Sequence, residues 1–284
     1  MTVSAARRQA VTRATAAPPG PVRGHVVVDG VSMTYATKGS STTAIADVTA
    51  TIREGRFVSV IGPSGCGKST LLDIVAGLLK PSTGEVTVGG ERLTGPRRDF
   101  AMVFQDDSTL HWRTVRDNIA LGLEIDGVEK KERYARADEM IRLVGLAGFA
   151  DHRPRQLSGG MRQRVAIARA LVMDPTMLLM DEPFGALDQQ TRTIVGEELL
   201  RIWESTRKSV LFVTHDIREA VTLSDEIWVM SRRPSRISQI VEVELPRPRG
   251  AEVLRSPEYT DQVNRLWDLI KGEVAASLRE QDPQ

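Results

Sequence analysis

Short apolar runs alternate with longer amphipathic segments along most of the chain. Runs rich in valine, isoleucine, leucine, methionine and phenylalanine, bounded by glycine or polar residues, predict buried strands. We expect these strands at 25–29, 57–61, 85–88, 176–180, 209–213, 227–230 and 240–245.

Helical spacing of apolar residues fills much of the remainder. We expect helices at 69–79, over much of 114–173 (129–144 as a solvated amphipathic helix), at 191–207 and at 257–280. Thr114 and Asp117 form a pattern similar to a capping box at the start of the second helical region. In the last helix, Val263, Leu266, Trp267 and Ile270 predict an apolar face that packs on the core. Strands that alternate with helices indicate an α/β fold with parallel strands in the sheet.

Composition narrows the class of protein. With 284 residues, the chain can form one large domain or a domain with a subdomain. Its net charge of +1 argues against nucleic acid as a partner. No apolar run approaches the ~20 residues of a membrane span, so another chain would supply any channel. The single cysteine, Cys66, fits a reducing compartment, and we expect it to be a small packed side chain without a redox role.

The first 23 residues are rich in alanine and arginine and contain no acidic residue. They lack the apolar segment of a secretory signal, which excludes that interpretation. An arginine-rich, acid-poor segment also resembles a transit peptide, but a disordered extension is the preferred hypothesis.

A glycine-rich loop follows the strand expected at 57–61 and precedes a helix, as a phosphate-binding loop requires. The pattern G-x-x-x-x-G-K-[ST] is formed by Gly62, Pro63, Ser64, Gly65, Cys66, Gly67, Lys68, Ser69 and Thr70. Its amides and the helix N-terminus would surround phosphate, and Lys68 would reach the β- and γ-phosphates. Ser69 would coordinate Mg²⁺, and Thr70 would add a phosphate contact. The sequence therefore predicts ATP and Mg²⁺ as ligands.

Two carboxylates, Asp181 and Glu182, end the strand expected at 176–180. Ligands of α/β sheets bind at the carboxyl ends of strands, so both would lie beside the phosphates. Asp181 would hold magnesium through water, and Glu182 would polarise the attacking water. After a strand, such a pair alone would only signal the start of a helix; the glycine loop upstream favours catalysis.

The segment from Leu157 to Arg164, with Ser158, Gly159 and Gly160, is similar to the signature motif of ABC-type ATPases. The resemblance extends over about residues 26–236. It implies a P-loop NTPase core with a parallel-containing sheet, an antiparallel β subdomain and a helical subdomain. It also implies a head-to-tail homodimer, in which the signature of one subunit caps the γ-phosphate bound to the other. A plain helix cap at Ser158 is the structural alternative.

Further positions match the family motifs one by one. Gln105 corresponds to the glutamine that approaches magnesium, and His215 to the switch histidine that contacts the γ-phosphate. Asp188 lies in the loop that couples the two sites. Tyr35 lies where the family stacks an aromatic ring on adenine. The resemblance thus implies Glu182, His215, Gln105 and Lys68 as the catalytic set.

Several sequence segments, among them 112–115 and 181–188, resemble those of the family branch that imports nitrate, sulfonate, taurine and related solutes. Arg218 stands where that branch often has an acidic residue, and His111 stands where it commonly has proline. Neither residue touches ATP, so these differences affect only the inference about the transported solute. The resemblance implies polytopic membrane permease subunits, a separate solute-binding protein and a peripheral place on the cytoplasmic face of the membrane. His111–Arg113 would receive the permease, with ordinary packing of Trp112 as the alternative.

We expect a disordered segment at 1–24, an ATPase domain at 25–245 with a helical subdomain at about 106–165, and a C-terminal helical extension at 246–284. The rival hypothesis is a soluble ABC ATPase of DNA repair, translation or iron–sulfur assembly. A coiled-coil insertion and a second cassette, expected for the first two, are absent. A GTPase is disfavoured because no Asn-Lys-x-Asp motif is present.

Overall fold

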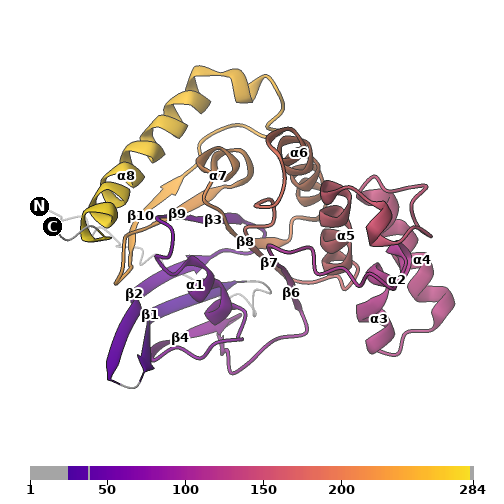
Figure 1. Ribbon diagram of the computed structural model, residues 1–284, viewed down its shortest axis with the longest axis horizontal. Helices are drawn as coiled ribbons and strands as arrows, with labels where there is room; N and C mark the ends of the chain where they lie inside the picture. The colour runs from indigo at the N-terminus through magenta and orange to yellow at the C-terminus, as the bar shows by residue number, and fades with distance from the viewer. Residues whose placement is uncertain (1–24, 38, 282–284) are drawn as a thin grey trace, which may run out of the picture.

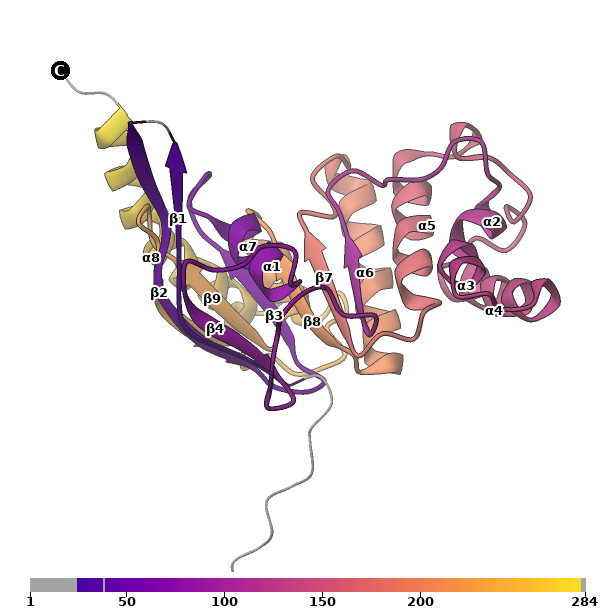
Figure 2. The same ribbon diagram turned by 90° about the horizontal axis from the view of Figure 1, so that it is seen from below.

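A computed structural model describes residues 25–37 and 39–281 of the chain. The segment expected to be disordered, 1–24, therefore lies outside the described residues. The described part contains two sheets and, at the far end of the molecule from β1 and β2, a group of helices (Figures 1 and 2).

A six-stranded sheet forms the centre, in the order β10-β9-β3-β8-β7-β6. Its strands are β3 (Phe57–Ile61), β6 (Phe100–Val103), β7 (Met177–Asp181), β8 (Ser209–Val213), β9 (Glu226–Met230) and β10 (Ile237–Glu242). All pairings are parallel except that of β10 with β9. The expected α/β fold with a parallel core is confirmed. Every residue of β3, β8 and β9 is buried, which explains their continuous apolar runs.

A four-stranded antiparallel sheet lies beside it, in the order β2-β1-β4-β5. It consists of β1 (Val26–Thr37), β2 (Ser40–Ile52), β4 (Thr83–Val88) and the short β5 (Glu91–Arg92). The helix α1 (Lys68–Val75) packs between the two sheets, where Leu71 and Val75 share one core with Val28 and Val60. This places the start of α1 against the end of β3.

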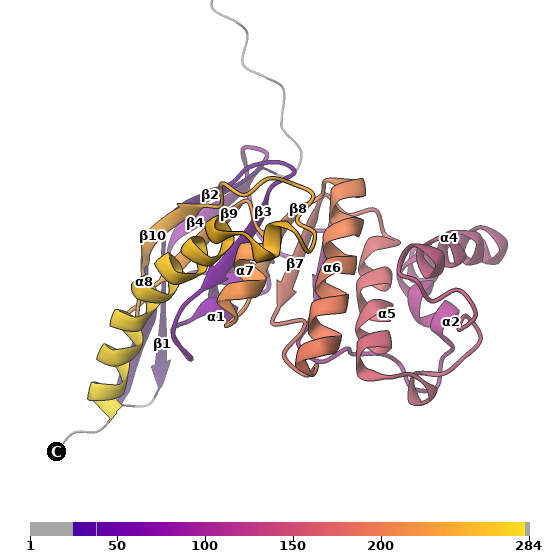
Figure 3. The ribbon, with the colours of Figure 1, turned by 90° about the horizontal axis from the view of Figure 1, so that it is seen from above.

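The other face of the central sheet is covered by helices. α5 (Gly159–Leu171) and α6 (Gln189–Thr206) share a core with β7 and β8. α7 (Ile217–Leu223) and α8 (Pro257–Gln281) pack near β9 and β10, with short 3₁₀ turns η1 (Pro154–Gln156) and η2 (Val253–Arg255) elsewhere. The helical group also contains α2 (Val115–Ile119), α3 (Leu121–Ile125) and α4 (Lys130–Leu143). Figure 3 shows α5 and α6 beside each other, and both share one core with the central sheet.

Several expected bounds are wrong for identifiable reasons. α1 ends at Val75 rather than at residue 79, because Gly77 has a φ of +73° and its amide donates to Ile74. β10 ends at Glu242 because its partner β9 begins at Glu226, directly opposite. β2 was not expected at all.

Helix α8 meets its expected bounds, but its apolar face is narrower than the sequence predicts. Leu266 and Ile270 are buried, whereas Trp267 is 57% exposed. Trp267 therefore does not belong to the packed face.

Candidate functional site

The glycine loop joins β3 to α1 as a tight turn. Gly65 and Gly67 have φ values of +71° and +109°, in the region that favours glycine. A Cβ on Gly67 would also lie 3.3 Å from Cγ1 of Ile45, so the backbone approaches β2 closely. The turn leads directly into the N-terminus of α1, whose free amides favour an anion.

Lys68 is buried at the first position of α1 and folds back over this turn. Its Nζ donates to the carbonyl oxygens of Gly62 at 3.1 Å and Pro63 at 3.2 Å. An ammonium group has three donors, so one remains for a further acceptor. Lys68 thus brings a fixed positive charge to the centre of the loop.

Ser69 and Asp181 meet across the sheet. The Ser69 hydroxyl donates to Oδ1 of Asp181 at 3.1 Å, although 112 positions separate them along the chain. Burial raises the pKa of the Asp181 carboxyl, the bond from Ser69 opposes this shift, and the negative charge of Glu182 adds to it. An additional cation at this point would relieve the cost of the buried carboxylate.

Glu182 and His215 form the second pair. Nδ1 of His215 lies 3.0 Å from Oε2 of Glu182. The Glu182 backbone is left-handed, with a φ of +42°, and its amide donates to the carbonyl of Val213 at 2.9 Å. A non-glycine residue in that region is uncommon and is found at functional sites held by their surroundings. The turn aims the carboxylate at the loop after β8.

Gln105 and Tyr35 border the same region. Gln105 is exposed two positions beyond β6, and a Cβ on Gly185 would lie 3.1 Å from its Nε2, so it lies beside the turn that follows Glu182. Tyr35 on β1 has its hydroxyl 3.4 Å from Oγ1 of Thr70 and is 44% exposed. Its ring is therefore accessible beside the loop, which suits stacking on a planar group.

The signature-like residues lie elsewhere. Ser158 is the N-cap of α5 and accepts a hydrogen bond from the Met161 amide at 3.3 Å, as the structural alternative requires. The glycines permit close packing on α6: a Cβ on Gly160 would lie 2.4 Å from Cγ2 of Thr191. α5 and α1 lie on opposite sides of β7 (Figures 1 and 3). Asp188 caps α6 by accepting from the Gln190 and Thr191 amides.

The structure thus brings most predicted site residues together at one edge of the central sheet. These are the loop 62–70 with Lys68 and Ser69, and Tyr35, Gln105, Asp181, Glu182 and His215. Ser158, Gly159, Gly160 and Asp188 instead gather where α5 meets the start of α6. One chain therefore carries a glycine-rich turn whose free amides favour an anion and, separately, a glycine-rich helix start.

The oxygen donors near the loop suit a small hard cation. Hydroxyl, carboxylate and amide oxygens are the ligands that Mg²⁺ prefers, together with waters and phosphates. Among residues 25–37 and 39–281, no group of three or more His, Cys, Asp or Glu side chains forms a metal site. The donor set of Ser69, Asp181 and Gln105 fits an ion shared with a phosphate ligand better than a closed protein cage.

Sequence analysis missed the residue that anchors the loop. Ser235 is fully buried, and its hydroxyl lies 2.8 Å from the carbonyl oxygen of Ala44 and 2.5 Å from that of Cys66, so its single proton is shared between these acceptors. It thereby joins β2, the glycine loop and the turn after β9. The sequence places Ser235 just before a strand, but only the three-dimensional fold shows that its hydroxyl contacts β2 and the glycine loop. Burial raises the pKa of the Cys66 thiol, in line with a packed side chain.

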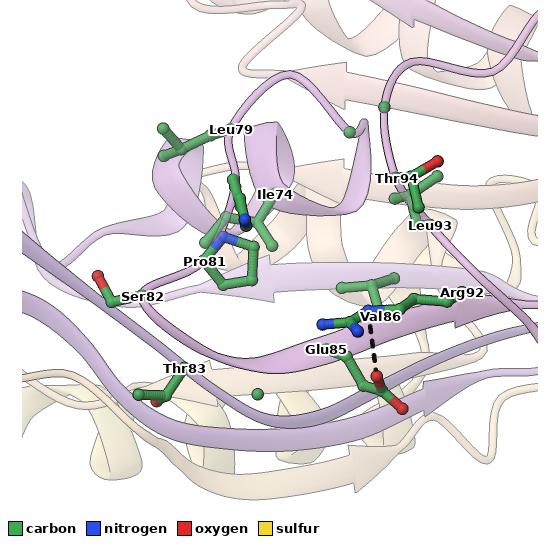
Figure 4. A pocket seen from close by; sticks show the side chains of 14 residues that line it. Ile74, Leu79, Pro81, Ser82, Thr83, Glu85, Val86, Arg92, Leu93 and Thr94 are labelled. Carbon is green, nitrogen blue, oxygen red and sulfur yellow. Dashed lines mark ion pairs between the residues drawn. The ribbon is translucent and has the colours of Figure 1, made fainter.

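A separate pocket of about 550 Å³ lies between the end of α1 and the strands β4 and β5 (Figure 4). Arg92 and Glu85 form an ion pair of 3.2 Å on its floor. None of the site residues named above lines this pocket. It is therefore not part of the candidate site.

Comparisons with known proteins agree with this geometry. A family model described as ABC transporter matches residues 45–185. An ABC transporter ATP-binding protein of Methanocaldococcus jannaschii is 46% identical over 89% of this chain and 93% of its own. A nitrate import ATP-binding protein of Synechocystis is 41% identical over 87% and 96%. A taurine import ATP-binding protein of Burkholderia pseudomallei is 48% identical over 73% and 80%.

A solved structure is also similar. It is a dimeric ATP-binding cassette in a post-hydrolysis state, bound to ADP and phosphate. It aligns with a TM-score of 0.67 and 34% identity, over 77% of this chain and 99% of its own.

Proposed function

Because this chain belongs to the ABC transporter family of ATP-binding proteins, we propose that it is the ATP-hydrolysing motor subunit of an importer for a small solute. The observation that carries the proposal is the arrangement at the edge of the central sheet. Lys68 lies over the glycine loop, Ser69 bonds to Asp181, and Glu182 faces His215. The residues that would bind the phosphates, the residues that would bind the cation and the pair that would act in hydrolysis therefore lie next to one another.

Each residue takes a role that its contacts suit. The loop 62–70 surrounds the phosphates, and Lys68 neutralises the β- and γ-oxygens. Ser69, Asp181 and Gln105 would hold Mg²⁺, which supplies charge neutralisation on the phosphates when bound. Glu182 orients and polarises the attacking water, and His215 contacts the γ-phosphate while holding the Glu182 carboxylate. Tyr35 stacks on the adenine, a contact that barely selects among bases.

A second copy of the chain completes the site. Ser158, Gly159 and Gly160 lie on the other side of β7 from the loop, so they would cap the γ-phosphate bound to a partner chain. Asp188 lies beside them and would connect the two sites. The similar solved structure is a dimer, which supports a head-to-tail homodimer here. ATP binding then closes the pair, and hydrolysis reopens it.

A groove beside Trp112 supports docking of a membrane partner. Trp112 is 72% exposed, and a groove of about 430 Å³ lies beside it, lined by residues that include Asp107, His111 and Arg155. Oxygen Oδ2 of Asp107 bonds to Nε of Arg162 at 2.8 Å, which ties this groove to the signature helix α5. An exposed tryptophan that follows His111, a lining residue of this groove, in the chain suits a protein interface.

Within the described part of the chain, no helix has the length and apolar character needed to cross a membrane. We assign the channel to separate permease subunits and place this chain peripherally at the cytoplasmic face. The relatives named for nitrate and taurine import support a small anionic or sulfonated solute. We assign its delivery to a separate solute-binding protein.

The test is a pull-down of the tagged chain from detergent-solubilised membranes, with bound proteins identified by mass spectrometry. Recovery of a polytopic membrane protein that stimulates ATP hydrolysis supports the importer assignment. Recovery of iron–sulfur assembly proteins alone would overturn the role in transport, while the assignment of ATPase activity would still stand.

A further inference from the structure

Arg192, on the first turns of α6, contacts three groups from two different segments. Its side chain is only 17% exposed. Nη2 donates to the carbonyl of Leu187 at 3.2 Å, Nη1 lies 3.5 Å from Oδ2 of Asp216, and Nε lies 3.5 Å from Oε1 of Glu219. The guanidinium therefore joins the loop before α6 to the start of α7.

One side of this junction leads to the hydrolytic pair. Oε2 of Glu219 accepts a hydrogen bond from the hydroxyl of Thr214 at 2.5 Å, and the amide of Asp216 donates to the same hydroxyl at 3.0 Å. Thr214 is buried and directly precedes His215, which faces Glu182. The position of the His215 ring thus depends on the hydrogen bonds of Thr214.

The other side leads to the signature helix. The loop residue Leu187, whose carbonyl Arg192 holds, packs its side chain against the start of α5: a Cβ on Gly159 would lie 3.5 Å from Cδ2 of Leu187. Gly160 packs against Thr191, the residue before Arg192. A displacement of the signature helix α5 would therefore first displace Leu187 and the loop that contains it.

Arginine is suited to such a junction because its planar fork can address several acceptors in fixed directions. Burial raises the pKa of the Glu219 carboxyl, while the bond from Thr214 and the charge of Arg192 oppose that shift. Arg192 thus favours the ionised form of Glu219, and this carboxylate accepts the hydrogen bond from the Thr214 hydroxyl. Nε forms an ion pair with Glu219 but no hydrogen bond, whereas Nη1 and Nη2 donate to Asp216 and Leu187. Lysine at this position would keep the charge but could not place two separate donors against Asp216 and Leu187.

We propose that Arg192 is a positioning residue that couples the signature helix to His215 and Glu182 within one chain. The inference rests on the proposed function, since it gives Arg192 a part in that hydrolysis. In the dimer, contact of the signature with the partner's ATP would be relayed through Leu187 and Arg192 to the switch histidine. Contiguous contacts become evidence of coupling only when the coupling is measured.

The experiment compares Arg192→Lys and Glu219→Gln with a matched control, Arg201→Lys. Arg201 is also on α6, but it bonds to Glu198 and the carbonyl of Leu143, away from the site. The first readout is the set of NMR chemical shifts of the His215 ring in the nucleotide-free chain, recorded at one fixed pH. The other three histidines, His25, His111 and His152, serve as internal controls for folding.

The second readout is the steady-state kinetics of ATP hydrolysis. We expect Arg192→Lys to change the NMR chemical shifts of the His215 ring while those of the other histidines stay the same. It should lower kcat roughly tenfold, within the range of typical coupling, with the KM for ATP unchanged. The double variant with Glu219→Gln should cost no more than the larger single effect, because members of one network are not additive.

Unchanged chemical shifts of the His215 ring, or equal kinetic losses in Arg192→Lys and Arg201→Lys, would overturn the proposal. Failure of the proposed function is distinguishable: a wild-type chain without ATPase activity would remove that function, while the NMR arm still decides whether Arg192 positions His215.

Discussion

His215 lies with its Nδ1 3.0 Å from Oε2 of Glu182, and the parallel pairing of β7 with β8 places them together. Asp181 is paired with Val213, so the residues that follow each strand leave the sheet at the same edge. The left-handed turn at Glu182 then directs its carboxylate toward the histidine. The side chains of Glu182 and His215, which follow two different strands, thereby meet at the same edge of the sheet.

Replacement of Glu182 by glutamine should remove hydrolysis and leave ATP binding intact. The amide keeps the shape of the side chain but cannot polarise water as a carboxylate does. We expect kcat to fall roughly 10²- to 10⁴-fold, the usual contribution of a general base. Phosphate release measures this, with Glu139→Gln on the exposed face of α4 as the control. Rapid hydrolysis by Glu182→Gln would remove Glu182 from its role.

Replacement of Lys68 by alanine should weaken ATP binding itself. It removes a charge-assisted contact to phosphate and leaves the carbonyls of Gly62 and Pro63 without their donor. Such contacts contribute roughly 1.5–3 kcal/mol, so the Kd for ATP should rise roughly ten- to a hundredfold. Titration calorimetry measures it. Lys80→Ala, in the pocket of Figure 4, should change nothing; the reverse order of effects would move the ATP site there.

Replacement of Trp112 by alanine should lower solute transport by the reconstituted complex and leave ATP hydrolysis by the isolated subunit unchanged. The reason is that Trp112 is exposed away from the hydrolytic pair and beside the groove that contains Asp107. Ile240→Ala on β10 is the control, because that side chain is also apolar and exposed. Equal losses in both assays would argue against a docking role for Trp112.

Replacement of Arg249 by methionine should destabilise the fold. Arg249 is buried, and the two terminal nitrogens of its guanidinium lie within hydrogen-bond distance of five carbonyl oxygens, those of Val221, Thr222, Ser224, Val243 and Leu245. Burial lowers its pKa to about 10. Its loss leaves several acceptors unsatisfied, so we expect the free energy of unfolding to fall by about 3 kcal/mol. Urea denaturation measures this.

Arg265→Met, at an exposed position on α8, is the control for that experiment and should stay within about 0.5 kcal/mol of the wild type. Coincident urea midpoints for the two variants would show that Arg249 does not secure the end of α7.

The sequence predicted the elements whose signals are local. β3, β7, β8 and β9 are continuous apolar runs because both faces of the central sheet are covered, and α6 and α8 carry helical spacing. β2 was missed because its first residues, Ser40 to Thr43, are polar and partly exposed. Its stability comes from pairing with β1, which is a tertiary effect.

The same contrast holds at the site. Contiguous motifs placed the glycine loop, Asp181 and Glu182 correctly at one sheet edge. Ser235 and Arg192 act through contacts with segments far away in the sequence or on another element, so spacing carried no signal for them. Exposure of Trp267 was likewise invisible, because helical spacing cannot tell which edge of the apolar face the neighbouring elements cover.

The central claim is that the loop of one chain and the signature of another hold the same ATP. Light scattering of Glu182→Gln with Mg²⁺ and ATP tests it most directly, with Gly159→Asp in the same background as comparison. The account predicts that Glu182→Gln doubles its mass on adding ATP, whereas the double variant binds ATP equally well and stays monomeric. A Glu182→Gln chain that binds ATP and remains a monomer, or a double variant that still dimerises, would contradict it.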